Sequence, residues 1–162
     1  MKIAIIGAGN LGISMAKGIL HSGAATSMYL TRRHPDTLQE FEAYGNVITT
    51  SDNRQAVSQS DILIFAVQPG DFPAVLTSVE DLLGENHVVI STITGFVISE
   101  IEAIIGTGRY IIRAMPNTAI SVGHSMTCLC SNEQGKQRLE LAQAIFNRMG
   151  HSMIIPEARM QA

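Results

Sequence analysis

Three glycines, at positions 7, 9 and 12, stand between a short apolar run and a segment of helical periodicity. Gly7 would allow a tight turn, Gly9 would let the backbone approach a pyrophosphate, and Gly12 would let the helix pack close to the strand. The first N–H groups of that helix would then face the anion. The alternative is a glycine-rich strand–helix turn that binds nothing. We expect a dinucleotide to contact the six residues of the turn, Gly7, Ala8, Gly9, Asn10, Leu11 and Gly12.

The residues that follow the second apolar run indicate which dinucleotide would bind. Binders of NAD usually have Asp or Glu about 20 residues after the turn, where it bonds the ribose 2′-hydroxyl. Here Thr31, Arg32 and Arg33 occupy that place, and no acidic residue occurs between Gly12 and Asp36. Two guanidinium groups suit a 2′-phosphate, because arginine presents a rigid fork of donors to phosphate oxygens. The sequence therefore predicts NADP(H) rather than NAD(H), against the alternative of a solvated basic turn before a helix.

Three further segments stand where strands of such a fold would end. Residues 66–69 (Ala-Val-Gln-Pro) and 92–95 (Thr-Ile-Thr-Gly) follow apolar runs, and residues 113–118 read Arg-Ala-Met-Pro-Asn-Thr. Ligands of open α/β sheets bind at the carboxyl ends of the parallel strands. Small or polar residues there would let a dinucleotide lie against the backbone, and Pro116 with Asn117 could position a polar group beside the nicotinamide. Each segment could equally be an ordinary loop, the last one a turn capped by Asn117 and Thr118.

Short apolar runs alternate with helical segments along the chain. Near-continuous runs of Ile, Val and Leu predict strands buried on both faces, as in parallel sheets. The predicted strands are residues 3–6, 27–31, 47–49, 62–67, 87–92, 110–113, 126–129 and 152–155. The predicted helices are residues 10–21, 36–44, 52–58, 71–83, 99–105 and 133–149. This alternation predicts an α/β fold, a doubly wound, mostly parallel Rossmann-type sheet with helices on both faces.

Length and composition restrict the classes of protein that fit. The 162 residues suffice for one α/β domain, and the 46% of hydrophobic residues indicate a buried core. A net charge of −3 gives no sign of a nucleic-acid partner. No apolar run reaches the roughly 20 residues of a membrane helix, and Gly7 interrupts the opening run, so we expect a cytoplasmic protein without membrane contacts. Cys128 and Cys130 have no cluster of further ligands nearby, which favours a reduced structural pair over a metal site.

Residues 2–12, 61–69 and 113–118 together resemble pyrroline-5-carboxylate reductase, over essentially the whole chain. The glycine turn is shared with many dehydrogenases, whereas the Met-Pro-Asn-Thr segment followed by Val122 and Gly123 is more particular to this family. The resemblance implies reduction of the cyclic imine 1-pyrroline-5-carboxylate to proline, by hydride transfer from NADPH or NADH. It also implies that the full-length protein is a homo-oligomer.

The resemblance further implies the extent of the cofactor site. The glycine turn would hold the pyrophosphate, Thr31 with Arg32 and Arg33 would meet the adenosine phosphate, and Asn53 would lie near the adenosine end. The path to the nicotinamide and the reacting ring would be lined by Ala66, Val67, Pro69, Thr94, Met115, Pro116 and Asn117. A protonated imine is already electrophilic, so we assign no catalytic acid, and we expect His124 to be a surface or structural residue.

This chain departs from the family pattern at several places. Gln68 stands where the family often has lysine, Ala119 where it often has proline, and Ser125 replaces a usual glycine. Family members continue past the position of Ala162 into a helical domain that supplies most of the dimer interface and much of the substrate carboxylate site. We therefore expect residues 1–156 to form the dinucleotide-binding domain and residues 157–162 to begin a segment leading to that helical domain. The chain by itself should have little or no reductase activity.

Three other functions fit the same residues. The first is another NADP-dependent reductase with the same N-terminal domain, of the coenzyme F420-dependent type or acting on a different imine or acid. The second is a non-enzymatic protein that binds NADP(H) in a regulatory role, which tight binding without turnover would indicate. The third is a Rossmann scaffold with no ligand, which a failed binding test would favour.

Overall fold

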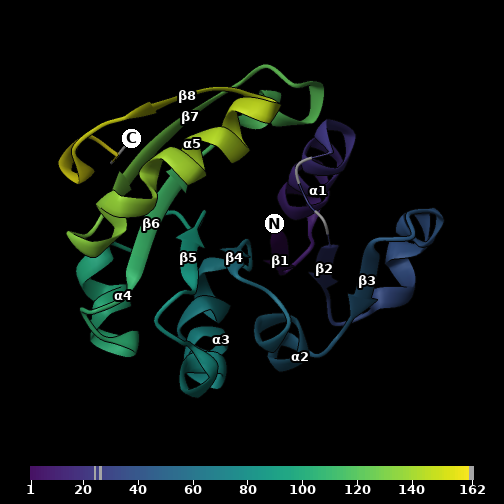
Figure 1. Cartoon of the computed structure of the whole chain (residues 1–162), viewed down its shortest axis with the longest axis horizontal. Coiled ribbons are helices and arrows are strands. Elements are labelled where there is room, and N and C mark those ends of the chain that lie inside the picture. The colour runs from purple at the N-terminus through teal and green to yellow at the C-terminus, as the bar shows by residue number, and fades with distance from the viewer. Residues whose placement is uncertain (24, 26, 161–162) are drawn as a thin grey trace.

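A single sheet flanked by helices forms the frame of the molecule in the computed structural model, which describes residues 1–23, 25 and 27–160 (Figure 1). Within these residues the sheet has eight strands in the order β3-β2-β1-β4-β5-β6-β7-β8. Neighbouring strands are parallel except β6 and β7, which are antiparallel. The strands are β1 (Lys2–Ile6), β2 (Ser27–Thr31), β3 (Val47–Thr50), β4 (Ile62–Phe65), β5 (Val88–Ser91), β6 (Tyr110–Met115), β7 (Ser125–Ser131) and β8 (Gly150–Ile154). All eight predicted strands are present, and the predicted fold class is confirmed.

Some strand ends differ from the prediction. β4 ends at Phe65 rather than Val67, because the chain turns into a 3₁₀ segment at Pro69, which has no N–H for the sheet. β5 begins after His87, whose ring Nδ1 accepts a hydrogen bond from the N–H of Gly84 in the preceding turn. β6 and β7 extend beyond the predicted ranges, since their antiparallel pairing runs from Ile112 opposite Ser131 to Met115 opposite Cys128. β8 begins at Gly150 and ends at Ile154, somewhat earlier than predicted.

Five α-helices and several 3₁₀ segments connect the strands of the described chain. The α-helices are α1 (Asn10–Ser22), α2 (Asn53–Ser58), α3 (Phe72–Val79), α4 (Ile98–Ile105) and α5 (Leu139–Phe146). The 3₁₀ segments are η1 (Pro35–Ala43), η2 (Pro69–Asp71), η3 (Glu80–Leu82), η4 (Thr118–Val122), η5 (Gln134–Arg138), η6 (Asn147–Met149) and η7 (Glu157–Arg159). α1 ends at Ser22, one residue after the predicted end, with Gly23 as its C-cap at φ of 70°. Asp52 caps α2 by accepting hydrogen bonds from the N–H groups of Arg54 and Gln55.

Three of the predicted helices are not continuous α-helices in the structure. Residues 35–43 form 3₁₀ structure rather than one α-helix, because the backbone leaves helical geometry at Leu38, with φ of −102°, and Leu38 and Phe41 are buried. The predicted helix 71–83 is divided into η2, α3 and η3, with Pro73 in the first turn of α3. The predicted helix 133–149 is divided into η5, α5 and η6. There Gly135 lies so close to β6 that an added Cβ would be 2.5 Å from the carbonyl oxygen of Ile111.

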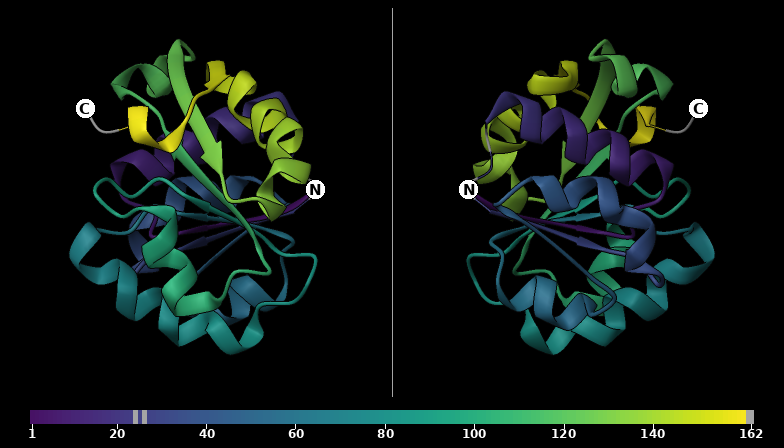
Figure 2. Two further views of the ribbon diagram at one scale, coloured as in Figure 1. Left: turned by 90° about the vertical axis from the view of Figure 1, so that its left-hand side faces the viewer. Right: turned by 90° about the vertical axis from the view of Figure 1, so that its right-hand side faces the viewer.

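Helices cover both faces of the sheet, as the two edge-on views show (Figure 2). One face packs against α1, η1 and α5, where Met15, Phe41 and Phe146 are buried. The other packs against α2, α3 and α4, where Phe72 and Ile101 are buried. This two-faced covering leaves the ends of the parallel strands as the open edge of the sheet, where ligands of such folds bind.

Two further sequence-based expectations concern single features. Among the described residues, no helix has both the length and the apolar character needed to span a bilayer. Cys128 and Cys130 are free thiols that contact the same core cluster, on the α4 side of the sheet. Burial raises the pKa of Cys130 to about 11, so this thiol is protonated at neutral pH.

Candidate functional site

The strand order reverses between β1 and β4, and the glycine turn lies at this point. Strand β2 continues from one side of β1 and strand β4 from the other, which opens a crevice at their carboxyl ends. Gly7 follows β1 with φ of +89°, and a Cβ there would lie 2.5 Å from the Val67 side chain. Only glycine therefore fits this position, by conformation and by space.

The other two glycines of the turn differ in what surrounds them. Gly9 has nothing within 4 Å of an added Cβ and stands as the N-cap of α1 in extended conformation. An added Cβ at Gly12 would lie 2.9 Å from the carbonyl oxygen of Gly7 and 3.2 Å from the Ile5 side chain. Gly12 thus allows the predicted close packing of helix on strand, while Gly9 leaves open space in front of the first turn of α1.

Thr31 supports the turn from the neighbouring strand. Its side chain is buried, and its hydroxyl oxygen accepts a hydrogen bond of 3.1 Å from the N–H of Gly7. The N–H of Ala8 donates to the carbonyl oxygen of Thr31 at 2.7 Å. Sequence reasoning assigned Thr31 to the ligand, whereas in the structure its hydroxyl is engaged by the turn itself.

A hollow of about 400 Å³ opens beside the glycine turn, over the ends of β2, β3 and β4. It brings together eight of the predicted residues, Gly7, Gly9, Thr31, Arg32, Arg33, Asn53, Ala66 and Val67. It also includes residues that were not assigned to the site, His34, Ser51, Gln68, Asp71 and Val75. We call it the adenosine-side hollow, because the predicted adenosine contacts lie in it.

The charges of this hollow come mainly from the two arginines. The Arg33 side chain is 86% exposed, and its Nη2 lies 4.0 Å from Oδ1 of Asp71, a long and solvated contact. Arg32 is half-buried, and within the described residues it forms no ion pair. The N–H of Arg32 donates to the carbonyl oxygen of Thr50, which fixes the backbone at the end of β2. Both guanidinium groups thus have donors available for an anion.

A second hollow, of about 370 Å³, lies on the other side of the turn, between α1 and η4. Four predicted residues line it, Asn10, Leu11, Pro116 and Asn117, together with Ser14, Ile120 and Ser121. The Asn117 side-chain oxygen accepts a hydrogen bond of 3.0 Å from the N–H of Ala119 and so caps η4. The capping that was the alternative interpretation of Asn117 is therefore present, and the same residue also faces the hollow. We call this the nicotinamide-side hollow.

Five predicted site residues line neither hollow. Ala8 and Gly12 are buried within the turn, and Pro69 and Thr94 are exposed beyond the ends of β4 and β5. Met115 packs partly buried against the core cluster on the α4 side.

The residues that sequence reasoning missed carry weak signals. Ser14 lies four residues after Asn10 on α1, one helical turn along the same face. Ser51 follows the end of β3 and precedes the predicted Asn53, so the carboxyl-end rule includes it as well. Val75 reaches the hollow from α3, and nothing in its sequence context indicates this.

The comparison with known protein families covers the part of the fold that contains the adenosine-side hollow. Residues 2–95 match the family described as NADP oxidoreductase, coenzyme F420-dependent. The chain belongs to this family. The matched residues include the glycine turn and every residue of the adenosine-side hollow, whereas Pro116 and Asn117 lie outside them.

The chain is also similar to pyrroline-5-carboxylate reductases. It is 36% identical to pyrroline-5-carboxylate reductase 2 of Dictyostelium discoideum, over 98% of this chain and 59% of that protein. It is 33% identical to the solved pyrroline-5-carboxylate reductase of Coxiella burnetii, with a TM-score of 0.89 over 96% of this chain and 58% of that one. The pyrroline carboxylate reductase of Plasmodium falciparum, solved with NADP bound, shares the fold at 24% identity and a TM-score of 0.87, over 99% of this chain and 59% of that one.

These relatives confirm the resemblance that the glycine turn and the Met-Pro-Asn-Thr segment indicate. The chain spans 59% of the length of the Dictyostelium protein and 61% of that of the Methanosarcina acetivorans pyrroline-5-carboxylate reductase.

Proposed function

We propose that this chain is the NADP(H)-binding part of an oxidoreductase that reduces 1-pyrroline-5-carboxylate to proline. The observation that carries the proposal is the adenosine-side hollow, where two arginines with free donors stand next to a glycine turn that leaves backbone open to a ligand. The similarity to pyrroline-5-carboxylate reductases supports the substrate, a small cyclic imine acid.

The residues present fit the phosphate groups of NADP(H). Arg32 and Arg33 stand at the end of β2, where the ribose of a dinucleotide lies in such folds, and would hold the 2′-phosphate. Gly9 leaves space before α1, and no acidic residue occurs in the first turn of that helix. The N–H groups there and the positive end of the helix dipole would hold the pyrophosphate. Asn53 would contact the adenosine.

The nicotinamide-side hollow would hold the other end of the cofactor. Pro116 has a fixed φ, and Asn117 is oriented by its hydrogen bond to Ala119, so both present a rigid wall opposite Asn10 and Leu11. Its oxygen being engaged, Asn117 offers the N–H groups of its amide. Ala66 and Val67 would line the path between the two hollows, with Pro69, Thr94 and Met115 as more distant supports. When bound, NADPH supplies the hydride, and the chain positions the ring and limits its orientation.

The proposal also includes the substrate site and the oligomeric assembly of the whole protein. The relatives are longer than this chain, and we propose that their additional length supplies the rest of the imine site and a homo-oligomer interface, with residues 157–162 leading toward it. The two free thiols are consistent with a reducing compartment, and we place the reaction in the cytoplasm.

Titration of NADPH and NADH, followed by cofactor fluorescence, tests the cofactor assignment. We expect NADPH to bind more tightly, and Arg32→Ala/Arg33→Ala to weaken NADPH by roughly 10- to 100-fold, since hydrogen bonds to charged groups contribute about 1.5–3 kcal/mol. NADH affinity should change little. The matched control is Arg148→Ala/Arg159→Ala, which removes the same charge from exposed sites outside both hollows. Equal loss with both double variants, or no binding of either nucleotide at millimolar concentration, would overturn the assignment.

A second candidate function follows from the family description, which names coenzyme F420. A reductase of that type would have the same NADP(H) site, but hydride would pass between NADP(H) and coenzyme F420 rather than to an imine. Assay of the full-length protein with 1-pyrroline-5-carboxylate separates the two: proline formation supports the first function, and tight NADPH binding without turnover supports the second or a regulatory role.

A further inference from the structure

Arg113 is the only charged residue that is buried among those the structure describes, with 2% of its surface exposed. It lies in β6, between Ser91 of β5 and Cys130 of β7 in the sheet. A buried charge is costly unless a counter-charge compensates it. Arg113 therefore depends strongly on whichever group pairs with it.

That group is Glu157, which lies 44 residues further along the chain in η7. Its Oε2 is 3.2 Å from Nη1 of Arg113. The Nε of Arg113 is buried and has no hydrogen-bond partner within the described part of the chain. The pairing is thus a single contact rather than a bidentate one, and among the described residues no second acid forms an ion pair with the guanidinium.

The same carboxylate oxygen has a second partner. Oε2 of Glu157 accepts a hydrogen bond of 2.7 Å from the N–H of Ile98, the first residue of α4. A carboxylate at this place satisfies one free N–H of the helix and interacts favourably with its dipole. One oxygen atom therefore connects the start of α4, which follows the loop after β5, with the carboxyl-terminal half of β6.

Of the two connected elements, β6 leads directly into the nicotinamide side of the proposed site. β6 continues from Arg113 to Met115 and then directly to Pro116 and Asn117, which line the nicotinamide-side hollow. The loop before α4 contains Thr94. The adenosine-side hollow lies over the ends of β2, β3 and β4, and β5 separates even β4, the nearest of these strands, from β6, at about 10 Å for the usual strand spacing.

We infer that Glu157 is a positioning residue for the nicotinamide end of the cofactor, acting through Arg113 and the start of α4. This inference rests on the proposed NADP(H) site. Without the carboxylate, Arg113 is left as an unpaired buried charge and moves toward water. The end of β6 moves with it, and Pro116 carries the displacement into the wall of the hollow. The adenosine-side hollow keeps its geometry, because none of its described residues forms a side-chain hydrogen bond or ion pair with Arg113 or Glu157.

The test compares two ligands on the Glu157→Gln variant of this chain. NADPH occupies both hollows, whereas adenosine 2′,5′-bisphosphate carries only the adenosine half. We expect the variant to bind NADPH roughly tenfold more weakly, which is about 1.4 kcal/mol, because the displaced wall of the hollow no longer fits the nicotinamide end. Its affinity for the bisphosphate should stay within about twofold of the parent chain. The matched control is Glu133→Gln, which removes an equally charged group from an exposed ion pair with Lys136.

The outcomes separate this inference from the proposed function. If the parent chain binds neither ligand, the proposed function fails. If it binds both and Glu157→Gln leaves the NADPH affinity unchanged, or weakens both ligands equally, Glu157 does not position the nicotinamide end. If Glu157→Gln fails to fold, Arg113→Met/Glu157→Gln removes both charges together, which restores a neutral core. Because no unpaired charge remains to displace the end of β6, this double variant should bind NADPH within about threefold of the parent chain. A selective tenfold loss of NADPH in the double variant would overturn the inference.

Discussion

Neighbouring residues at the end of β2 have different tasks. Thr31 points into the protein and holds the N–H of Gly7, whereas Arg32 and Arg33 point to the hollow. Replacing Thr31 with Val removes the acceptor and leaves that N–H without its present partner. We expect a loss of about 1–3 kcal/mol in the free energy of unfolding, measured by urea denaturation, together with weaker NADPH binding. Thr31→Ser keeps the hydroxyl and should retain most of both. If Val and Ser variants behave alike, the hydrogen bond has no role in the turn.

The local part of the site could be predicted from residue types alone. Gly7, Gly12 and the two arginines follow from spacing, because a tight turn and a phosphate impose requirements on single residues. Asp71 and Val75 could not be found in this way, since they reach the hollow through the packing of η2 and α3 on the sheet. Thr94 was assigned by the general rule for strand ends, and the actual path of the loop leaves it exposed outside both hollows.

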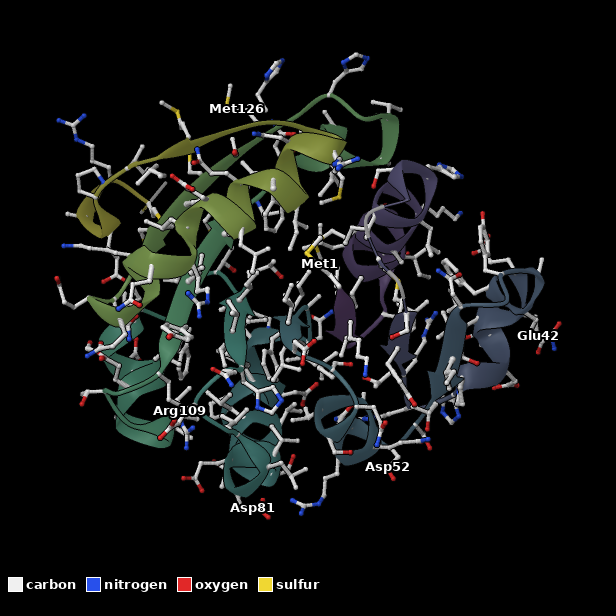
Figure 3. The ribbon with its side chains drawn as sticks, viewed as in Figure 1. Met1, Glu42, Asp52, Asp81, Arg109 and Met126 are labelled. Atoms are coloured by element: carbon white, nitrogen blue, oxygen red, sulfur yellow. The ribbon has the colours of Figure 1, made fainter. Side chains whose placement is uncertain are left out.

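At the scale of elements, one exposed ion pair ties α2 to η3, the segment that directly follows α3. Nη1 and Nη2 of Arg54 bond both carboxylate oxygens of Asp81, at 2.6 and 2.9 Å, and Nη1 also donates to the carbonyl oxygen of Ser78. Asp81 lies below α3 in Figure 3. The hydrogen bond from Arg54 lowers the pKa of Asp81. A carboxyl whose pKa is lower in the folded state stabilises the fold above its usual pKa, about 4, and this contribution is lost as the pH falls.

Asp81→Asn should therefore reduce the free energy of unfolding at pH 7, and the difference from the parent chain should disappear as the pH falls below about 4. Urea denaturation at a series of pH values measures this. Asp36→Asn is the control, because Asp36 is exposed and has no ion pair among the described residues. A difference between Asp81→Asn and the parent chain that is constant across the pH range would show that the charge of Asp81 is not what stabilises the pair.

The strands of this fold could be predicted from the sequence, whereas the helices could be predicted only in part. Strands buried on both faces require continuous apolar runs such as residues 62–65 and 88–90, and few other structures use them. Helical periodicity does not distinguish one long helix from α and 3₁₀ pieces in series. The division of residues 133–149 depends on the closeness of Gly135 to Ile111 across η5 and β6, which only the folded chain shows.

At the scale of the whole molecule, the proposed site has two ends held by different parts of the sheet. The adenosine-side hollow belongs to β2, β3 and β4, and the nicotinamide-side hollow to α1 and η4 beyond β6. The family match ends at residue 95, between these parts. The turn from Gly7 to Gly12 contributes residues to both hollows, so a ligand that spans them would connect the halves of the molecule through its own contacts as well as through the core.

Thermal unfolding measures how much each of the two hollows contributes to ligand binding. A ligand that binds only the folded chain stabilises it by about 2.7 kcal/mol at 100 times its Kd, which raises the Tm of a chain of this size by roughly 5–10 °C. Two ligands present at the same multiple of their own Kd stabilise the folded chain equally. NADPH and adenosine 2′,5′-bisphosphate are therefore compared at the same concentration. NADH, which lacks the 2′-phosphate, is the control for that group. We expect NADPH to raise the Tm more than either. Equal shifts in Tm from NADPH and the bisphosphate would mean that the nicotinamide-side hollow adds nothing to binding. Equal shifts in Tm from NADPH and NADH would mean that Arg32 and Arg33 do not bind the 2′-phosphate.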